Sequence, residues 1–256
     1  MSKKKTETET KSAGNGKGGE AQATGLPPLY TSVALINAEA HGKMKFKAVQ
    51  NYKFAKNANS VVLAAVEFSQ AAAHYPIVFG KSGDDLIAHA VLGHTKDENL
   101  YVNGRGKWRE NTYIPAYVRR YPFLLLESKE DDRLSLLADT ESGFFNEKNG
   151  DALYDGDKPT EAAEQALKFC VDFHREILKT HQLLKQISDA DILVERNADV
   201  SLPDEKKARI AGFLVVDEEK LGKLEDEKFL ELRRTGALNL IYSHLWSMRS
   251  WNNLLG

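Results

Sequence analysis

Residues 74–79 read His-Tyr-Pro-Ile-Val-Phe, and residues 120–127 read Arg-Tyr-Pro-Phe-Leu-Leu-Leu-Glu. In both stretches a Tyr-Pro step leads directly into an apolar run. Proline fixes its own φ and disfavours helical geometry in the residue before it, so a short helix upstream of each stretch should end at the tyrosine. A continuous apolar run is typical of a strand buried on both faces. We therefore predict that the two runs form neighbouring strands of the core.

The rest of the first half contains more short strand-like segments, separated by turns. Period-two alternation and apolar runs predict strands at 30–36, 45–49, 61–66, 86–92, 100–102 and 134–138. Asn103-Gly104 is a typical hairpin turn. Short hairpins join antiparallel strands, whereas parallel pairs need long crossovers. Residues 26–145 should therefore be β-rich and mainly antiparallel.

Helical patterns dominate the second half of the chain. A helix-start signal at 157–161 and apolar residues at helical spacing predict a long amphipathic helix to about Ile187, and a charged helix is predicted over 225–234. Two strands, at 191–196 and 210–216, are expected between them. Gly236 should break the second helix, and a last helix over 237–255 should dock through Leu238, Ile241 and Leu245. The predicted fold class is α+β: a β-rich, mainly antiparallel N-terminal half, with helices concentrated in the C-terminal half (157–256).

Composition bounds the architecture and the kinds of partner. The chain has 256 residues, 42% of them hydrophobic and 28% charged, which is typical of a globular protein with a sizeable core. Residues 1–25 are rich in Lys, Thr, Glu and Gly and are predicted to be a disordered tail, which leaves a single domain over 26–256. A formal net charge of −2 provides no general attraction to nucleic acid.

Targeting and redox signals favour a soluble cytoplasmic protein. No apolar run approaches the roughly 20 residues that cross a bilayer, and no apolar segment of a secretory signal follows the N-terminal lysines. A single cysteine, Cys170, excludes an internal disulfide and fits a reducing compartment. Cys170 lies among apolar neighbours in the predicted long helix, where a buried structural thiol is expected rather than a nucleophile.

Metal and catalytic motifs are not evident in the sequence. His89 and His94 are five residues apart, so a strand would place them on opposite faces. Cys170 and His174 are spaced to bind together on a helix, but no second pair completes four ligands. No nucleophile elbow, phosphate-binding glycine loop or His-Glu-x-x-His motif is present. We predict no metal and no cofactor.

The best candidate for a recognition surface is residues 113–122, which contain three tyrosines, two arginines and two prolines. Tyrosine and arginine are enriched at binding hot spots. The predicted ligand- or partner-binding residues are His74, Tyr75, Tyr113, Tyr117, Arg119, Arg120, Tyr121 and His244. The alternative interpretation is structural, with the arginines paired to acidic turns and the tyrosines capping a sheet edge.

Several segments resemble the SapC family of surface-layer-associated bacterial proteins. These are residues 63–68 with 74–79, the 113–123 stretch, Gly-Phe-Leu-Val-Val-Asp-Glu-Glu-Lys-Leu at 212–221, and 236–248. The similarity covers about 27–250 and implies an accessory role in the biogenesis or export of surface-layer protein, through binding of a polypeptide or small ligand. It supplies no catalytic residues. A similarly named transporter permease is a membrane protein, and this chain has no segment suited to that role.

A competing hypothesis is an enzyme of unknown reaction. Its site would be assembled from residues distant in the sequence, namely His74, Arg119, Arg120, Asp139 and His244. Convergence of these side chains in one closed pocket would favour the enzyme. An open groove lined by Tyr and Arg would favour the binding protein.

Overall fold

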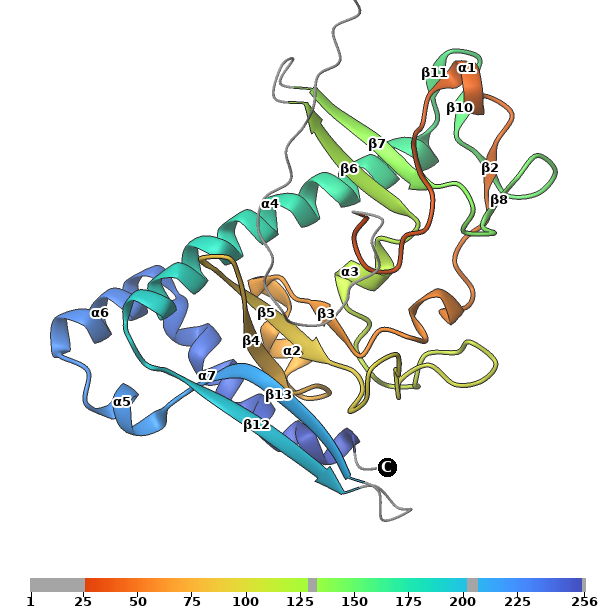
Figure 1. The fold of residues 1–256 in the computed structure, drawn as a ribbon. Helices are drawn as coiled ribbons and strands as arrows, with labels where there is room; N and C mark the ends of the chain where they lie inside the picture. The colour runs from red at the N-terminus through yellow and green to blue at the C-terminus, as the bar shows by residue number, and fades with distance from the viewer. Residues whose placement is uncertain (1–25, 129–132, 202–206, 255–256) are drawn as a thin grey trace, which may run out of the picture.

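The structure is a computed structural model that describes residues 26–128, 133–201 and 207–254. Two sheets of unequal size lie along one long helix, α4 (Glu161–Asp189) (Figure 1). Every strand pair in the described residues is antiparallel. Sheets concentrate in the first half and helices α4 to α7 in the second, which confirms the predicted α+β class. The predicted disordered tail, residues 1–25, lies outside the described residues.

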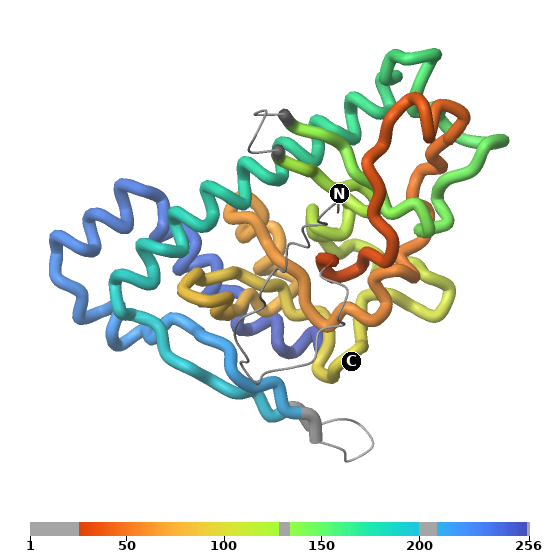
Figure 2. The backbone as a smooth tube through the Cα atoms, turned by 45° about the horizontal axis from the view of Figure 1, so that its top comes forward, coloured from red at the N-terminus to blue at the C-terminus, as the bar shows by residue number. Residues whose placement is uncertain are grey.

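The larger sheet has five strands in the order β12-β13-β4-β5-β3. Their bounds are Leu193–Ser201 for β12, Lys207–Val216 for β13, Ile77–Ser82 for β4, Asp85–Val91 for β5 and Ser60–Val62 for β3. Strands β12 and β13 form a long ribbon that runs out past β4 at the bottom of the molecule (Figures 1 and 2).

The second sheet has three strands in the order β1-β7-β6, with β1 at Val33–Leu35, β7 at Arg133–Asp139 and β6 at Phe123–Ser128. Small pairings complete the β structure: β2 (Lys45–Phe46) lies between β8 (Phe145–Asn146) and β9 (Asp151–Ala152), and β10 (Tyr154–Asp155) pairs with β11 (Lys158–Pro159). Both sheets contact α4, which connects their two cores.

The prediction that the two Tyr-Pro runs form neighbouring strands is wrong. The first run became β4 in the five-stranded sheet, and the second became β6 in the three-stranded sheet. Each strand instead pairs with the strand that follows it along the chain, β4 with β5 and β6 with β7. Such hairpins close short loops, which costs less chain entropy than pairing two distant segments.

The helices before the Tyr-Pro steps are present, as predicted. α2 (Phe68–Ala71) and α3 (Ala116–Arg119) each end shortly before the tyrosine. Other short helical elements are α1 (Ala38–His41), α5 (Glu218–Gly222) and the 3-10 turns η1 (Lys53–Ala55) and η2 (Ala65–Glu67).

Several predicted strands are shorter than expected. The 61–66 strand stops at Val62, because Glu67 accepts a hydrogen bond from the Ala64 backbone N–H and draws the chain into η2. The 45–49 strand is only two residues long. No strand forms over 100–102, where an isolated bridge joins Val102 to Trp108 across the predicted turn.

The C-terminal helices follow the predicted order. α6 spans Asp226–Thr235, and Gly236 ends it with φ 90°, a conformation that glycine adopts without strain. α7 (Ala237–Ser247) continues as a 3-10 helix, η3 (Met248–Leu254), so the α-helix is shorter than predicted. α7 docks against the core as expected. However, its buried face is centred on Leu240, Ile241 and His244, and the predicted Leu238 and Leu245 are only partly buried.

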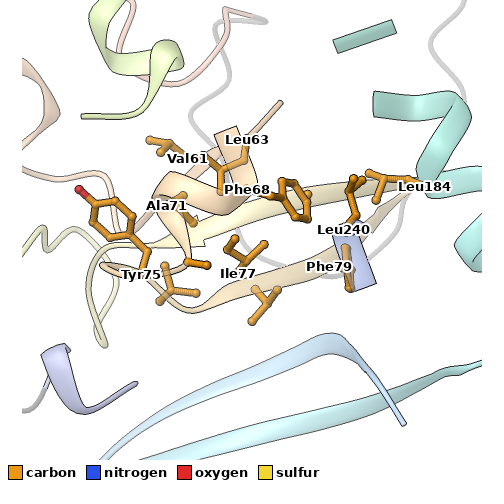
Figure 3. Packing of buried hydrophobic residues seen from close by; sticks show 14 of the residues in the cluster. Val61, Leu63, Phe68, Ala71, Tyr75, Ile77, Phe79, Leu184 and Leu240 are labelled. Carbon is orange, nitrogen blue, oxygen red and sulfur yellow. The ribbon is translucent and has the colours of Figure 1, made fainter. Parts of the chain in front are cut away.

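The main core packs against the face of the five-stranded sheet that carries Ile77 and Phe79, and it extends to Val78 on the other face. Ile77 and Phe79 of β4 pack among side chains from α2, α4 and α7 (Figure 3). Figure 3 labels Phe68 and Ala71 of α2, Leu184 of α4 and Leu240 of α7 among these contributions. Because strand side chains alternate between faces, Val78 and Gly80 point to the opposite face of β4.

Candidate functional site

The predicted recognition surface, residues 113–122, which we call the Tyr-Arg stretch, forms hydrogen bonds with other parts of the fold. The Tyr75 hydroxyl donates to the Tyr113 carbonyl and accepts from the Trp108 indole at 3.2 Å. The Tyr117 hydroxyl donates to the Pro28 carbonyl at 2.8 Å. Tyr75 and Tyr117 are both buried. Their hydroxyls therefore already have partners within the fold.

The hydroxyl of Tyr121 contacts the buried carboxylate of Asp139. The Tyr121 hydroxyl donates to Asp139 Oδ2 at 3.2 Å, and the same oxygen accepts from the Thr31 N–H at 2.8 Å. Burial, with the Asp139 carboxylate next in importance, raises the pKa of Tyr121 well above its usual value. Asp139 thus fixes the N-terminal segment to the three-stranded sheet.

A buried carboxylate that the sequence analysis missed organises the start of α3. Glu67 Oε1 accepts from the Tyr113 hydroxyl at 2.9 Å and from the Ala116 N–H at 2.7 Å. The Arg119 guanidinium in turn donates to the Tyr113 hydroxyl at 3.1 Å. Burial, together with Glu67, raises the pKa of Tyr113 to about 12. The sequence signal was a lone Glu between apolar residues, which also fits an ordinary surface position.

The two arginines connect α3 with α4 through aromatic rings. The Arg119 guanidinium lies 5.5 Å from the ring centre of Phe169. The Arg120 guanidinium lies 4.8 Å from that of Phe173 and 4.9 Å from that of Tyr117. Cation–π contacts of this kind are stabilising, particularly when they are partly desolvated. They therefore differ from the arginine–carboxylate pairs of the structural alternative.

His74 and His244 have different environments. The backbone carbonyl of His74 accepts from the Tyr101 hydroxyl at 2.6 Å and from the Asn253 amide at 3.0 Å, while its half-buried ring has a pKa lowered by burial. The ring of His244 is fully buried on α7. No hydrogen bond or ion pair joins any two of His74, Arg119, Arg120, Asp139 and His244, all of which are described. The structure therefore does not join these five side chains into one polar network.

His244 lies at the junction of β4 and β13, which we call the seam. Its Nδ1–H donates to the Ile77 carbonyl at 2.7 Å, and its Nε2 accepts from the Val216 N–H at 3.0 Å. These partners require the neutral ring, and burial lowers the pKa of His244 to about 4. Among the described residues, Leu214 with Phe79 is the only direct ladder pair of the seam. At one end of the seam, the His244 imidazole therefore connects the backbones of β4 and β13 in place of a direct hydrogen bond between them.

At the other end of the seam the ribbon diverges from β4 and leaves a groove of about 170 Å³. Strands β4 and β5 line it with Val78, Gly80 and His89, and the ribbon lines it with Ile210 and Phe213. The lining residues are Asn59, Ser60, Val78, Phe79, Gly80, His89, Val91, Gly93, Ile210 and Phe213. None of them is an acidic or basic residue apart from His89, whose pKa is lowered by burial.

Gly80 and His89 define the middle of the groove, and its lining favours a largely apolar occupant. Gly80 has no side chain, and a Cβ built there would lie 3.6 Å from the His89 ring. The Nδ1 atom of His89 is buried and has no hydrogen-bond partner among the described residues. Buried polar atoms in proteins are nearly always satisfied, so an unsatisfied one is a sign of a missing partner. None of the groove residues was predicted from the sequence.

Comparison with known proteins assigns the chain to a family. The SapC family model matches residues 36–254, and the protein belongs to this family. Neither a search of curated proteins nor a search of solved structures found a match. In the part of the chain that the structure describes, no helix is long and apolar enough to cross a membrane. Over the same residues, no three His, Cys, Asp or Glu side chains gather as metal ligands would.

Proposed function

We propose that this protein is a non-enzymatic accessory protein that acts in surface-layer biogenesis or export by holding an apolar group of its partner in the seam groove. The groove carries the proposal: apolar walls, a neutral imidazole with an unsatisfied nitrogen, and no lysine, arginine or carboxylate in its lining. Small-molecule sites are concave and mostly apolar, with few polar groups. A preformed apolar cavity of about 150 Å³ accommodates benzene, so the groove volume suits one phenyl or leucyl side chain.

A capped amino acid is a suitable probe of the groove. N-acetyl-phenylalaninamide is uncharged and presents an apolar side chain with amide groups, and N-acetyl-glycinamide lacks the side chain. In a titration followed by two-dimensional amide NMR, the first should shift the signals of Gly80, His89 and Val91, and the second should not. Shifts located elsewhere, or equal shifts from both compounds, would contradict the proposal.

Gly80→Val provides the matched variant. The Cβ at Gly80 meets only ordinary contacts, so the protein should fold with the groove filled. Gly104→Val is the control, because a Cβ there meets nothing within 4 Å. Gly80→Val should abolish the shifts and Gly104→Val should retain them. The same response from both variants would place the binding site outside the groove.

The Tyr-Arg stretch stays a second predicted partner surface. Arg119 is the exposed member, and its guanidinium lies over the rings of Tyr113 and Phe169. A pull-down with purified surface-layer protein, comparing wild type with the Arg119→Ala/Arg120→Ala double variant, tests it. Loss of binding with native far-ultraviolet circular dichroism would support a contact surface. Equal recovery from both proteins would leave the stretch with its structural role alone.

A further inference from the structure

Strand β4 has an incompletely paired edge at the seam. In an antiparallel strand, alternate residues direct their N–H and C=O groups to opposite neighbours. The Ile77 N–H and C=O point away from β5, toward Ser247 at 2.9 Å and His244 at 2.7 Å. Phe79, two residues on, pairs with Leu214 of β13. Lys81 is the next residue in this series, so its backbone groups point toward β13 as well.

The ladder between β4 and β13 stops before it reaches Lys81. Phe79 and Leu214 form the single pair between these strands, although β4 makes six pairs with β5. On β13 the register shifts opposite Arg196 and Ala198, and Gly212 within this irregular stretch has φ 75°. The ribbon therefore bends away just where it would pair with Lys81. Among the described strands, none pairs with this side of Lys81.

We propose that an extended polypeptide segment of a partner adds as a strand to β4 at Lys81 and places an apolar side chain in the seam groove. An unpaired strand edge is a template for such β-augmentation, in which the backbone provides affinity and side-chain pockets provide specificity. This proposal rests on the proposed function and names the occupant as a polypeptide.

Register and charge define the partner segment. Phe213 of β13 already lies opposite Gly80, because Leu214 pairs with Phe79. A partner residue opposite Ser82 would point to the same face as Gly80, and a long apolar side chain there would reach the groove diagonally. Its neighbour, opposite Lys81, would point to the other face. Lys81 is exposed and has no ion pair with a described residue, so an acidic side chain there is complementary. The partner segment therefore carries an apolar residue next to an acidic one.

The chain's own N-terminal segment does not meet this requirement. Residues 1–25 include three glutamates but, apart from Met1, no apolar side chain larger than alanine. A methyl group would leave most of the groove unfilled. The occupant is therefore a segment of another polypeptide.

Selection from a phage library of short random peptides, on immobilised full-length protein, tests the proposal. Wild type should enrich peptides with a large apolar residue beside an acidic one. Lys81→Glu should instead enrich an apolar residue beside lysine or arginine. Synthetic peptides from the two selections should exchange preference by roughly fivefold in Kd, the size of one cross-strand charge pair. N-methylation of the amide that bonds to Lys81 should abolish binding.

The outcomes distinguish binding in the seam groove from strand addition at Lys81. If Gly80→Val abolishes peptide binding while Lys81→Glu and N-methylation change nothing, the groove is a binding site but strand addition is wrong. If Gly80→Val binds the selected peptides as wild type does, the groove itself is not used. Sedimentation that shows self-association of wild type, abolished by Lys81→Glu, would make a second copy of this chain the occupant and overturn the proposal.

Discussion

The imidazole of His244 joins two strands of the five-stranded sheet, with its Nδ1–H on the Ile77 carbonyl and its Nε2 on the Val216 N–H. The ring packs against Phe79 with 4.7 Å between ring centres. Phe79 also lines the groove on the seam. His244 therefore supports the binding site from within the core rather than through contact with a ligand.

The first prediction concerns acid stability. Burial lowers the pKa of His244 from 6.5 to about 4, so between these values the unfolded chain binds a proton that the folded chain does not. This group's contribution to stability is complete above pH 6.5 and is lost as the pH falls toward 4. The expected loss is roughly 3 kcal/mol in the free energy of unfolding. Urea titrations across this pH range measure it.

A matched pair of variants isolates the histidine. His244→Ala should be less stable at pH 7, since Ile77 and Val216 then lack partners at every pH. It should lose the part of the dependence between pH 6.5 and 4 that His244 contributes and keep the part from His74 and His89, whose pKa values burial also lowers. His181→Ala, on α4 outside the seam, should keep the wild-type dependence. A wild-type pH profile in His244→Ala would show that another group is responsible.

The second prediction concerns the buried carboxylate. Glu67 accepts hydrogen bonds from the Ala64 and Ala116 N–H groups and from the Tyr113 hydroxyl. Glu67→Gln replaces one accepting oxygen with an NH₂ donor, so at least one of these donors loses its partner. We expect destabilisation by about 1–3 kcal/mol in chemical denaturation. Glu110→Gln, an exposed counterpart, should be neutral. Equal stability of the two variants would show that Glu67 is not required in the core.

The third prediction orders three positions of the C-terminal helices. Ile241 is fully buried, Leu245 is partly buried and Asn252 is exposed. Substitution of a buried Ile or Leu by Ala typically costs about 2–5 kcal/mol. Ile241→Ala should therefore lower Tm most, Leu245→Ala clearly but less, and Asn252→Ala little. Equal melting of the three variants would mean that α7 is not part of the core.

The fourth prediction concerns the thiol. Cys170 is buried on α4, and burial raises its pKa to about 12. The thiolate is the reactive form, so alkylation by iodoacetamide at pH 7.5 should be very slow in the native protein and rapid in denaturant. Mass spectrometry of the intact chain measures both rates. Rapid labelling of the native protein would contradict the buried position of Cys170.

Long regular patterns were predictable from the sequence. The helix α4 follows its apolar periodicity over many turns. Gly236 ends α6 because the backbone there is in the left-handed region, which glycine adopts without strain. The sheet to which β4 and β6 each belong was not predictable. Both strands have the same apolar pattern, and no local sequence feature indicates which sheet each one enters. The predicted strand over 100–102 does not form, because side-chain hydrogen bonds hold that segment as a loop. One of them is donated by the Asn99 amide to the Ala55 carbonyl.

The seam groove left almost no signal in the sequence. Gly80 resembles any turn glycine at the end of a strand, and Phe213 resembles any core residue. They become parts of one groove only because β13 pairs with β4 at a single position and then diverges. The predicted role of His244 in binding rested on its residue type, whereas the structure reveals the partners that fix its position.

A crystal structure of the protein with a peptide selected on the wild type tests the central claim most directly. The account predicts an apolar side chain of the peptide over Gly80, between His89 and Phe213, with the peptide backbone bonded to Lys81. A peptide bound elsewhere, with the groove left as it is in the free protein, would contradict it.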